Sequence, residues 1–464
     1  MGKTNWLEYD VEEMVKGDKQ NIWHHLKPHK VFEHQEQMVV VKGDGIVITD
    51  IRGREYIDVT SGGVWSVMVG YGRESIAKAV YDQLVKMPYF AGAFGNIPAI
   101  KFAEKLLEKL PRLDKVYFSN SGSEANEKAF KLVRQASHVS PERKGKFKIL
   151  YRDRDYHGTT LGAMSATGQI QRKKDFGPFP EGFVEFPNCC CYRCPFDKTY
   201  PGCNIECAHA IEDVIAREGA DTIGGLIVEP IVAGGGIIPP VKEYYPIVQE
   251  ICNKHDIWLI FDEVVCGFGR TGKFWGHDHY DVDPDIVTMA KGLASSYEPL
   301  SATVVKQKVF DCFLNDPSNP DTRWNFFRDI STYGGCAGPM AAALESTRII
   351  EDENLLENCR VVGAYLLEKL NELKALPLVG DVRGVGLFCG VEFVRDKKTK
   401  EPVSEEEMAK IIGNVMAENV IVGRTNSSFD GLNTVMNFAP SLIITKEQVD
   451  IVVAAVRKAI EKGI

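Results

Sequence analysis

The stretch Trp258-Leu-Ile-Phe-Asp-Glu-Val-Val265 is an apolar run interrupted near its end by two acids, and Met289-Ala-Lys-Gly-Leu293 follows it. A short, continuous apolar run is typical of a strand that is buried on both faces of a sheet. Other strand candidates lie at 148–151 and 222–228, and they alternate with helical patterns at 98–110, 125–137, 206–218 and 243–254. This alternation predicts an α/β fold with a mainly parallel, doubly wound sheet and helices on both faces.

The two ends of the chain show a different pattern. Hairpin-like strands are expected within residues 38–57 and 382–393, with an amphipathic helix close to the C-terminus. We therefore expect a large domain over residues 76–344. Residues 1–75 and 345–464 are expected to form one smaller, discontinuous α+β domain.

Lys291 and Asp262 are the candidate catalytic residues of the core. A lysine in a small, apolar stretch is poorly solvated, which disfavours its ammonium form and leaves an amine that can form a Schiff base. A lysine at the edge of an apolar segment can also be a surface residue whose ammonium group extends into water. Asp262, at the end of the predicted strand, can pair with a protonated pyridine nitrogen.

A third feature is the turn Asn120-Ser-Gly-Ser-Glu-Ala-Asn126, which connects a strand-like run to a helix-like run. Backbone N–H groups at such a helix N-terminus attract a phosphate, although the same residue types also cap an ordinary helix. A phosphate-binding turn, a strand-end aspartate and a lysine together indicate pyridoxal 5'-phosphate as the cofactor.

The composition excludes several classes of protein. A net charge of −9 argues against nucleic acid or an anionic membrane as a partner. No stretch reaches the roughly 18 apolar residues of a membrane span, and residues 1–10 lack the apolar region of a signal peptide. We expect a cytoplasmic protein whose 12 cysteines are reduced.

A glycine-rich motif offers an alternative cofactor. Gly267-Phe-Gly-Arg-Thr-Gly272 matches the pattern of a dinucleotide site. The residues after it lack the apolar period of a helix and contain structure breakers. We therefore do not interpret the motif as a nicotinamide-binding site.

A cysteine cluster offers a metal site. Its members are Cys189, Cys190, Cys191, Cys194, Cys203 and Cys207, with His209 nearby. Cys191 and Cys194 have zinc-like spacing, but no second pair of that spacing follows. We therefore expect no metal and interpret the cluster as a surface loop of reduced cysteines.

A series of motifs extends from about Lys42 to the C-terminus: Ser121-Gly-Ser-Glu-Ala125, Tyr156-His-Gly158, Val228-Glu-Pro230, Phe261-Asp-Glu-Val264, Ala290-Lys-Gly292, Thr332-Tyr-Gly-Gly335, Val382-Arg-Gly384 and Phe438-Ala-Pro440. In type and order they resemble those of the class III, ω-type aminotransferases, which have fold type I of the pyridoxal phosphate enzymes. By this resemblance, Lys291 binds the cofactor covalently and shuttles the 1,3-proton, and Asp262 holds the pyridinium nitrogen.

The resemblance also implies the rest of the cofactor site. Val264 packs on one face of the ring, and Tyr156 stacks on the other. Gly122 and Ser123 hold the phosphate, and Thr332 reaches it from the neighbouring subunit of a homodimer, which can pair into a tetramer. The remaining cofactor-binding residues are Ser121, His157 and Glu229. A histidine such as His157 more often makes a local hydrogen bond than transfers a proton.

The substrate class depends on arginines. Many relatives that accept ornithine, acetylornithine or 4-aminobutyrate carry an arginine directly before the Phe-Ala-Pro segment, where this chain has Asn437. Arg424 stands where amine:pyruvate enzymes carry a mobile arginine. We therefore expect Arg424 to bind the acid group of the amine donor and of the 2-oxo acid acceptor.

Aromatic residues suggest a short donor. By the same resemblance Trp65, Phe94 and Tyr156 line the substrate pocket, some of them across a dimer interface. The segments 58–65, 69–73 and 23–26 are most similar to those of taurine:pyruvate aminotransferases. We expect transfer from taurine to pyruvate, giving sulfoacetaldehyde and alanine by a ping-pong mechanism. The alternatives are β-alanine or another ω-amine as the donor, and an aminomutase or decarboxylase reaction.

Overall fold

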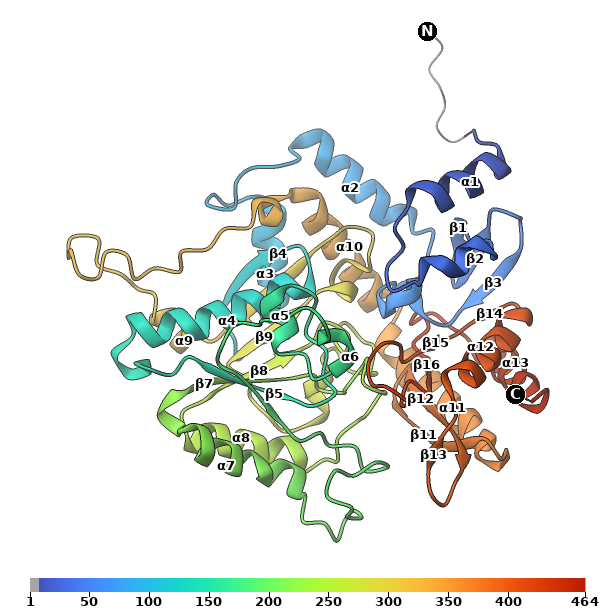
Figure 1. Ribbon diagram of the computed structural model, residues 1–464. Coiled ribbons are helices and arrows are strands. Elements are labelled where there is room, and N and C mark those ends of the chain that lie inside the picture. The colour runs from blue at the N-terminus through green and yellow to red at the C-terminus, as the bar shows by residue number, and fades with distance from the viewer. Residues whose placement is uncertain (1–7, 464) are drawn as a thin grey trace.

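The computed structural model describes residues 8–463, and its centre is a seven-stranded sheet (Figure 1). The strands are β4 (Lys115–Ser119), β5 (Lys148–Arg152), β6 (Phe183–Phe186), β7 (Ile223–Val228), β8 (Trp258–Asp262), β9 (Ile286–Met289) and β10 (Ser301–Val305). Their order is β4-β10-β9-β8-β7-β5-β6. The pairs from β6 to β9 are parallel, and β10 is antiparallel to both of its neighbours. The mainly parallel sheet is thus confirmed.

Helices cover both faces of this sheet. α4 (Gly122–Val139) lies on one face, and α7 (Glu206–Glu218) and α8 (Tyr244–Lys254) lie on the other (Figure 1). In β8, Leu259 and Phe261 join the core under α7 and α8, whereas Ile260 joins the core under α4. Burial on both faces explains why the strand sequence is continuously apolar.

The remaining helices of this lobe lie beside the sheet. α2 (Glu74–Lys86) and α3 (Ile97–Lys109) both pack against α10 (Ala337–Asp352), and α3 also contacts β4. Three short helices complete the lobe: α5 (Leu161–Ser165), α6 (Ile170–Lys173) and α9 (Gln307–Asp311).

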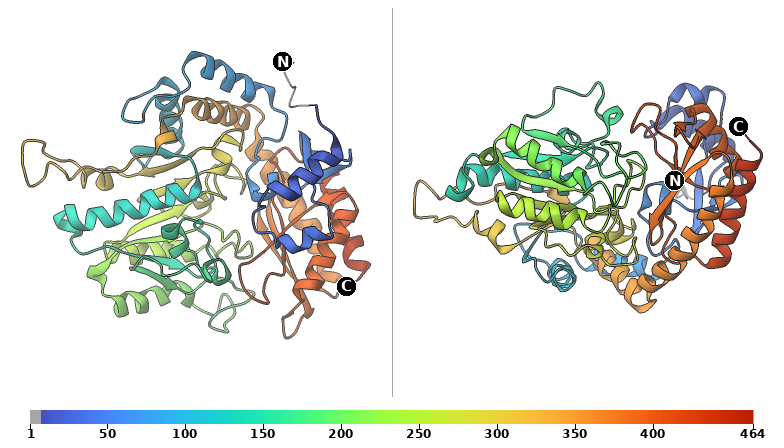
Figure 2. Two further views of the ribbon diagram at one scale, coloured as in Figure 1. Left: turned by 45° about the horizontal axis from the view of Figure 1, so that its top comes forward. Right: turned by 90° about the horizontal axis from the view of Figure 1, so that it is seen from below.

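A second lobe contains both ends of the described chain (Figure 2). One sheet has β1 (Val40–Asp44), β2 (Val47–Asp50), β3 (Glu55–Asp58) and β14 (Val420–Ile421); the other has β11 (Val379–Val385), β12 (Phe388–Asp396), β13 (Glu401–Pro402), β15 (Gly423–Arg424) and β16 (Val435–Phe438). The helices are α1 (Val11–Asn21), α11 (Leu355–Glu372), α12 (Glu405–Ala417) and α13 (Lys446–Glu461). Because β14 pairs with β3, the two ends share a sheet. The domain boundaries stay a prediction, and residues 1–7 lie outside the described residues.

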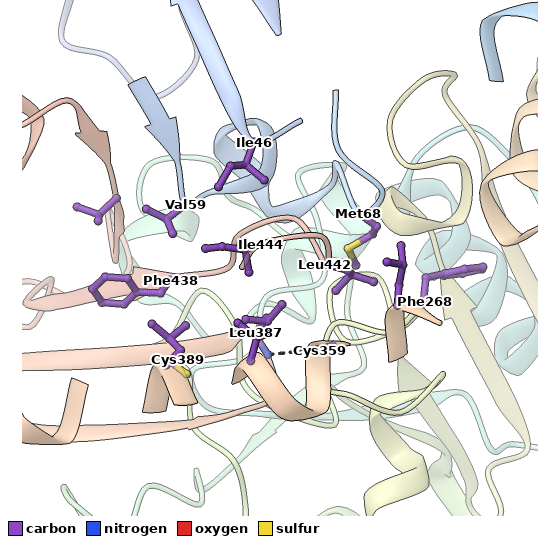
Figure 3. Packing of buried hydrophobic residues seen from close by; sticks show 14 of the residues in the cluster. Ile46, Val59, Met68, Phe268, Cys359, Leu387, Cys389, Phe438, Leu442 and Ile444 are labelled. Carbon is purple, nitrogen blue, oxygen red and sulfur yellow. Dashed lines mark hydrogen bonds between the residues drawn. The ribbon is translucent and has the colours of Figure 1, made fainter. Parts of the chain in front are cut away.

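The two lobes share one buried apolar cluster. Figure 3 shows Met68 next to Leu442 and Phe268, which come from three distant parts of the chain. The backbone N–H of Leu442 donates to the carbonyl of Met68 at 2.8 Å. This shared core fixes the position of one lobe against the other. Within residues 8–463, none of the helices has the length and apolar character needed to cross a membrane.

Candidate active site

Asp262 ends β8 at the carboxyl edge of the large sheet, and its side chain is buried. Its Oδ1 accepts a hydrogen bond from the backbone N–H of Val264 at 3.0 Å. Its Oδ2 accepts one from Asn126 Nδ2 at 2.7 Å and lies 2.8 Å from Nδ1 of His157. His157 is therefore held against the carboxylate of Asp262. These contacts hold the carboxylate in one place, as a partner for a cationic ring nitrogen must be held.

Asn126 is a supporting residue to which the sequence analysis assigned no role. It is buried in α4, where its Nδ2 also donates to the carbonyl of His157 at 2.7 Å. Its Oδ1 accepts from Thr288 Oγ1 on β9, again at 2.7 Å. A polar amide on the buried face of a helix needs such partners, and this was the signal that could have identified it.

Lys291 follows β9, the strand beside β8, and begins a 3₁₀ turn with a positive φ of 45°. Burial lowers the pKa of its amine, and the nearby Glu229 and Asp262 act in the opposite direction. Its Nζ lies 5.3 Å from the centroid of the Trp65 ring. The side chain is half-buried, and its amine lies over an aromatic ring instead of extending into water. A positive φ in a residue other than glycine is a strained conformation that is common at functional sites.

Glu229 is a buried acid next to this lysine. Burial raises its pKa well above the usual range, and the neighbouring Asp155 and Asp262 add to the effect. Its Oε2 accepts from the backbone N–H groups of Ala233 at 3.1 Å and Tyr156 at 3.3 Å. Glu229 is therefore fixed close to the lysine in an environment that favours the neutral acid.

A buried ion pair supports Glu229 from β5, and the sequence analysis overlooked it. Arg152 contacts Asp155 at 2.9 Å and also donates to the carbonyl of Glu229 at 2.6 Å. Asp155 Oδ2 accepts from the backbone N–H of Glu229 at 2.9 Å. Charged residues directly after a buried strand were the signal for this pair.

The predicted phosphate turn forms the N-terminus of α4. Ser121 caps the helix, since its Oγ accepts from the backbone N–H of Glu124 at 3.2 Å, so its hydroxyl has a structural partner. Ser123 Oγ accepts from the backbone N–H of Thr159 at 3.1 Å. Among the described residues, no acceptor is bonded to the backbone N–H groups of Gly122 and Ser123. The turn is therefore a capped helix start that still offers free donors to an anion, and phosphate binding stays a prediction.

These residues fit pyridoxal 5'-phosphate. A Cβ on Gly122 would lie 2.9 Å from Val264 Cγ1, so the turn and the residue that is expected to cover the ring are in close contact. Nε2 of His157 is buried without a hydrogen-bond partner in the described part of the chain. The anion site, the carboxylate and the amine thus lie at neighbouring ends of α4, β8 and β9.

Trp65 forms one wall of the site. It ends the tight turn Ser61–Trp65, in which Gly62 and Gly63 have φ values of 84° and 82°. Its ring contacts Phe388 edge-on at 5.6 Å, and its Nε1 donates to Asn437 Oδ1 at 3.3 Å. Asn437, which stands where many relatives have an arginine, therefore positions this aromatic wall.

Three predicted residues lie apart from this cluster within one chain. Arg424, on β15, forms an ion pair with Glu405 at 3.2 Å. Phe94 is 64% exposed and contacts Phe90. Thr332 is exposed as well.

The glycine motif at 267–272 is structural. The guanidinium of Arg270 is buried and donates to the backbone carbonyls of Leu387 and Pro440 in the second lobe. It also donates to Ser61 Oγ at 3.2 Å, next to the Trp65 turn. Only a short 3₁₀ segment, Gly276–His279, follows the motif, so the helix that a dinucleotide site needs is missing at this place.

The cysteine cluster is only in part the surface loop that the sequence predicted. Cys189 and Cys190 are buried in the core under α7, so the description as a surface loop is wrong for them, whereas Cys191 is exposed. All 12 cysteines are free thiols, and burial raises the pKa of Cys189 to about 12. Among residues 8–463, no group of three or more histidine, cysteine or acidic side chains is placed to hold a metal ion.

Comparisons with known proteins agree with this geometry. Residues 30–460 match the family described as aminotransferase class-III. The chain is 51% identical to a taurine–pyruvate aminotransferase of Bilophila wadsworthia and 49% identical to a hypotaurine/taurine–pyruvate aminotransferase of Paracoccus denitrificans, with 98% of each chain covered. A crystal structure of a Bacillus anthracis aminotransferase superposes with a TM-score of 0.93 at 41% identity, covering 98% of this chain and 99% of the other.

Fold and site together define a pyridoxal phosphate-dependent transferase of fold type I. The chain belongs to the class III aminotransferases, and pyridoxal 5'-phosphate is its cofactor.

Proposed function

We propose that this enzyme transfers the amino group of taurine to pyruvate, giving sulfoacetaldehyde and alanine. The observation that carries the proposal is the cluster of the half-buried Lys291 with the buried Asp262 and Glu229, in a chain about half identical to taurine–pyruvate enzymes over 98% of its length. β-Alanine is the closest alternative donor, because it carries a carboxylate on the same two-carbon amine.

The roles of the chain follow from the site. When bound, pyridoxal phosphate supplies an aldehyde for the amine and an electron-withdrawing ring. Asp262 would keep the ring nitrogen charged, and the amine of Lys291, with its lowered pKa, would be the base that takes a proton from the substrate carbon bearing the amino group and the acid that gives the proton back. Trp65 and Tyr156 exclude water around this transfer.

The half-reactions test this proposal. Taurine alone should remove the visible absorption of the bound cofactor, and pyruvate alone should then restore it, because the amino group remains on the enzyme between the two steps. The measurement is a stopped-flow absorbance titration with stoichiometric taurine, repeated with β-alanine. Recovery of the spectrum without any 2-oxo acid would instead indicate an aminomutase or a decarboxylase. A faster reaction with β-alanine would assign the donor differently.

We also propose a homodimer in which Thr332 and Phe94 complete the site of the other subunit. The two residues lie on neighbouring segments, because the backbone N–H of Ala337 donates to the carbonyl of Pro88 at 3.1 Å. The surface around them exposes large apolar side chains, which favours burial against another chain: Tyr81, Val85, Phe90, Ile97, Ile330 and Tyr333. Such dimers can pair further into a tetramer.

This assembly predicts that the smallest active unit is a dimer. Sedimentation velocity of the loaded enzyme at assay concentration should show no active monomer, and Thr332→Ala should release the cofactor faster, because the phosphate loses a hydrogen bond. Thr322, on the same connecting segment, provides a control variant, Thr322→Ala. A monomer with full activity would contradict the proposal.

A cytoplasmic location completes the proposal. All 12 cysteines are free thiols, including several that lie close together, and a reducing compartment preserves such thiols.

A further inference from the structure

Arg172, in the short helix α6, is a largely buried cation beside the active site. Its Cζ lies 5.3 Å from the centroid of the Tyr156 ring, and its Nη2 donates to the carbonyl of Asn426 at 2.9 Å. Its Nε is buried without a hydrogen-bond partner among residues 8–463. Burial lowers its pKa, and the only titratable group in the described chain that counteracts this effect is Tyr156.

These partners satisfy only some of the hydrogen-bond donors of the Arg172 guanidinium. Arginine has five N–H donors in a planar fork, and a ring face and one carbonyl leave most of them unused. A buried charge without a counter-charge is unfavourable, and proteins normally supply a carboxylate or a bound anion. The fork fits the oxygens of a carboxylate, and of other oxyanions, in a two-point contact.

The surroundings place Arg172 between Tyr156 and the chain segment that follows Arg424. The backbone N–H of Gln171 donates to the carbonyl of Ser428 at 3.2 Å, and Asn433 Nδ2 donates to Gln171 Oε1 at 3.0 Å. Helix α6 is therefore attached to residues 426–433, and the guanidinium lies between this segment and Tyr156.

Arg424 has a different environment. Its guanidinium is paired with Glu405, whose other oxygen accepts from Asn433 Nδ2 at 2.8 Å. To bind a substrate anion, Arg424 must first leave a carboxylate, whereas Arg172 has none to leave.

We infer that Arg172 recognises the acid group of the substrates, the sulfonate of the amine donor and the carboxylate of the 2-oxo acid, beside the Tyr156 ring. This inference rests on the proposed function for the identity of the donor. It assigns to Arg172 the role that the sequence analysis gave to Arg424 alone.

The variant Arg172→Met tests the inference, because methionine keeps an unbranched apolar stem and removes the charge. Single-turnover half-reactions are measured with taurine, with L-alanine, and with propylamine, which has no acid group. We expect kcat/KM to fall about ten- to a hundred-fold for taurine and alanine and less than about threefold for propylamine. Ethanesulfonate, which lacks an amine, serves as an inhibitor. Its inhibition constant should rise by about the same factor by which kcat/KM for taurine falls.

Arg154 offers a matched control. Its Cζ lies 5.0 Å from the ring of Phe429, and its Nε is also buried without a partner in the described residues, but it has the carboxylate of Asp153 nearby. Arg154→Met should therefore not discriminate between charged and uncharged amines. Arg172→Lys, which keeps the charge, should recover part of the affinity for ethanesulfonate and remains informative if the methionine variant folds poorly.

No loss for either amine would overturn the inference. Equal losses for propylamine and taurine would also overturn it and make Arg172 a brace for residues 426–433. A selective loss in Arg424→Met but not in Arg172→Met would also overturn it. The half-reaction with alanine distinguishes a failure of this inference from a failure of the proposed function. If the wild-type enzyme rejects taurine, the proposed function fails. The loss of alanine activity in Arg172→Met would still decide the role of Arg172.

Discussion

Replacing Lys291 with alanine is expected to lower turnover by more than about a thousand-fold, to below detection in a steady-state assay, because the group that moves the proton is removed. The lowered pKa of this amine and its position beside Trp65 and Asp262 are the grounds for assigning it this role. The remaining anchors, Asp262 and the N-terminus of α4, are untouched. The variant should therefore still bind pyridoxal phosphate without a covalent bond, as dialysis followed by an absorbance spectrum would show.

The control for this variant is Lys131→Ala, at a lysine on the exposed side of α4 that is 53% exposed and pairs with Asp329. It should retain wild-type turnover and the wild-type spectrum. Equal circular dichroism spectra and melting temperatures within a few degrees would show that both variants are folded. Turnover of Lys291→Ala near the wild-type rate would remove Lys291 from the mechanism.

The main elements of the site were predictable because each depends on local sequence. A buried strand that ends in an acid identified Asp262, a small glycine-containing turn before a helix identified Gly122, and an apolar context identified Lys291. The alternation of strands and helices likewise predicted the large sheet, since the period of apolar residues reflects which faces are covered.

The supporting contacts were not predictable from local patterns. Asn126 meets Asp262 across 136 residues of sequence, and Arg172 meets the carbonyl of Asn426 across 254. Such pairs depend on the packing of complete elements, and one sequence carries no signal of which distant side chains meet. In the proposed homodimer, the positions of Thr332 and Phe94 relative to the cofactor would depend on a second copy of the chain, so neither the sequence pattern nor one chain fixes them.

The substitution Asp262→Asn should have an effect nearly as large as the loss of the lysine. An amide cannot neutralise a cationic ring nitrogen, so the ring loses the charge that makes it withdraw electrons. In either rotamer the amide would also place an N–H₂ group against a donor, Asn126 Nδ2 on one side or the backbone N–H of Val264 on the other. We expect kcat to fall by more than about a hundred-fold, with slower loss of the α-proton in stopped-flow experiments with deuterated alanine.

A comparison with Asn126→Ala distinguishes the effect of the Asp262 charge from the effect of its position. This variant removes one hydrogen bond to Asp262 but leaves the carboxylate, its contact with His157 and its bond from the backbone of Val264. One hydrogen bond to a charged group contributes roughly 1.5–3 kcal/mol, so kcat should fall by only about ten- to a hundred-fold. If Asp262→Asn had a smaller effect than Asn126→Ala, the carboxylate would act through its position rather than its charge. The pairing of Asp262 with the ring nitrogen would then be wrong.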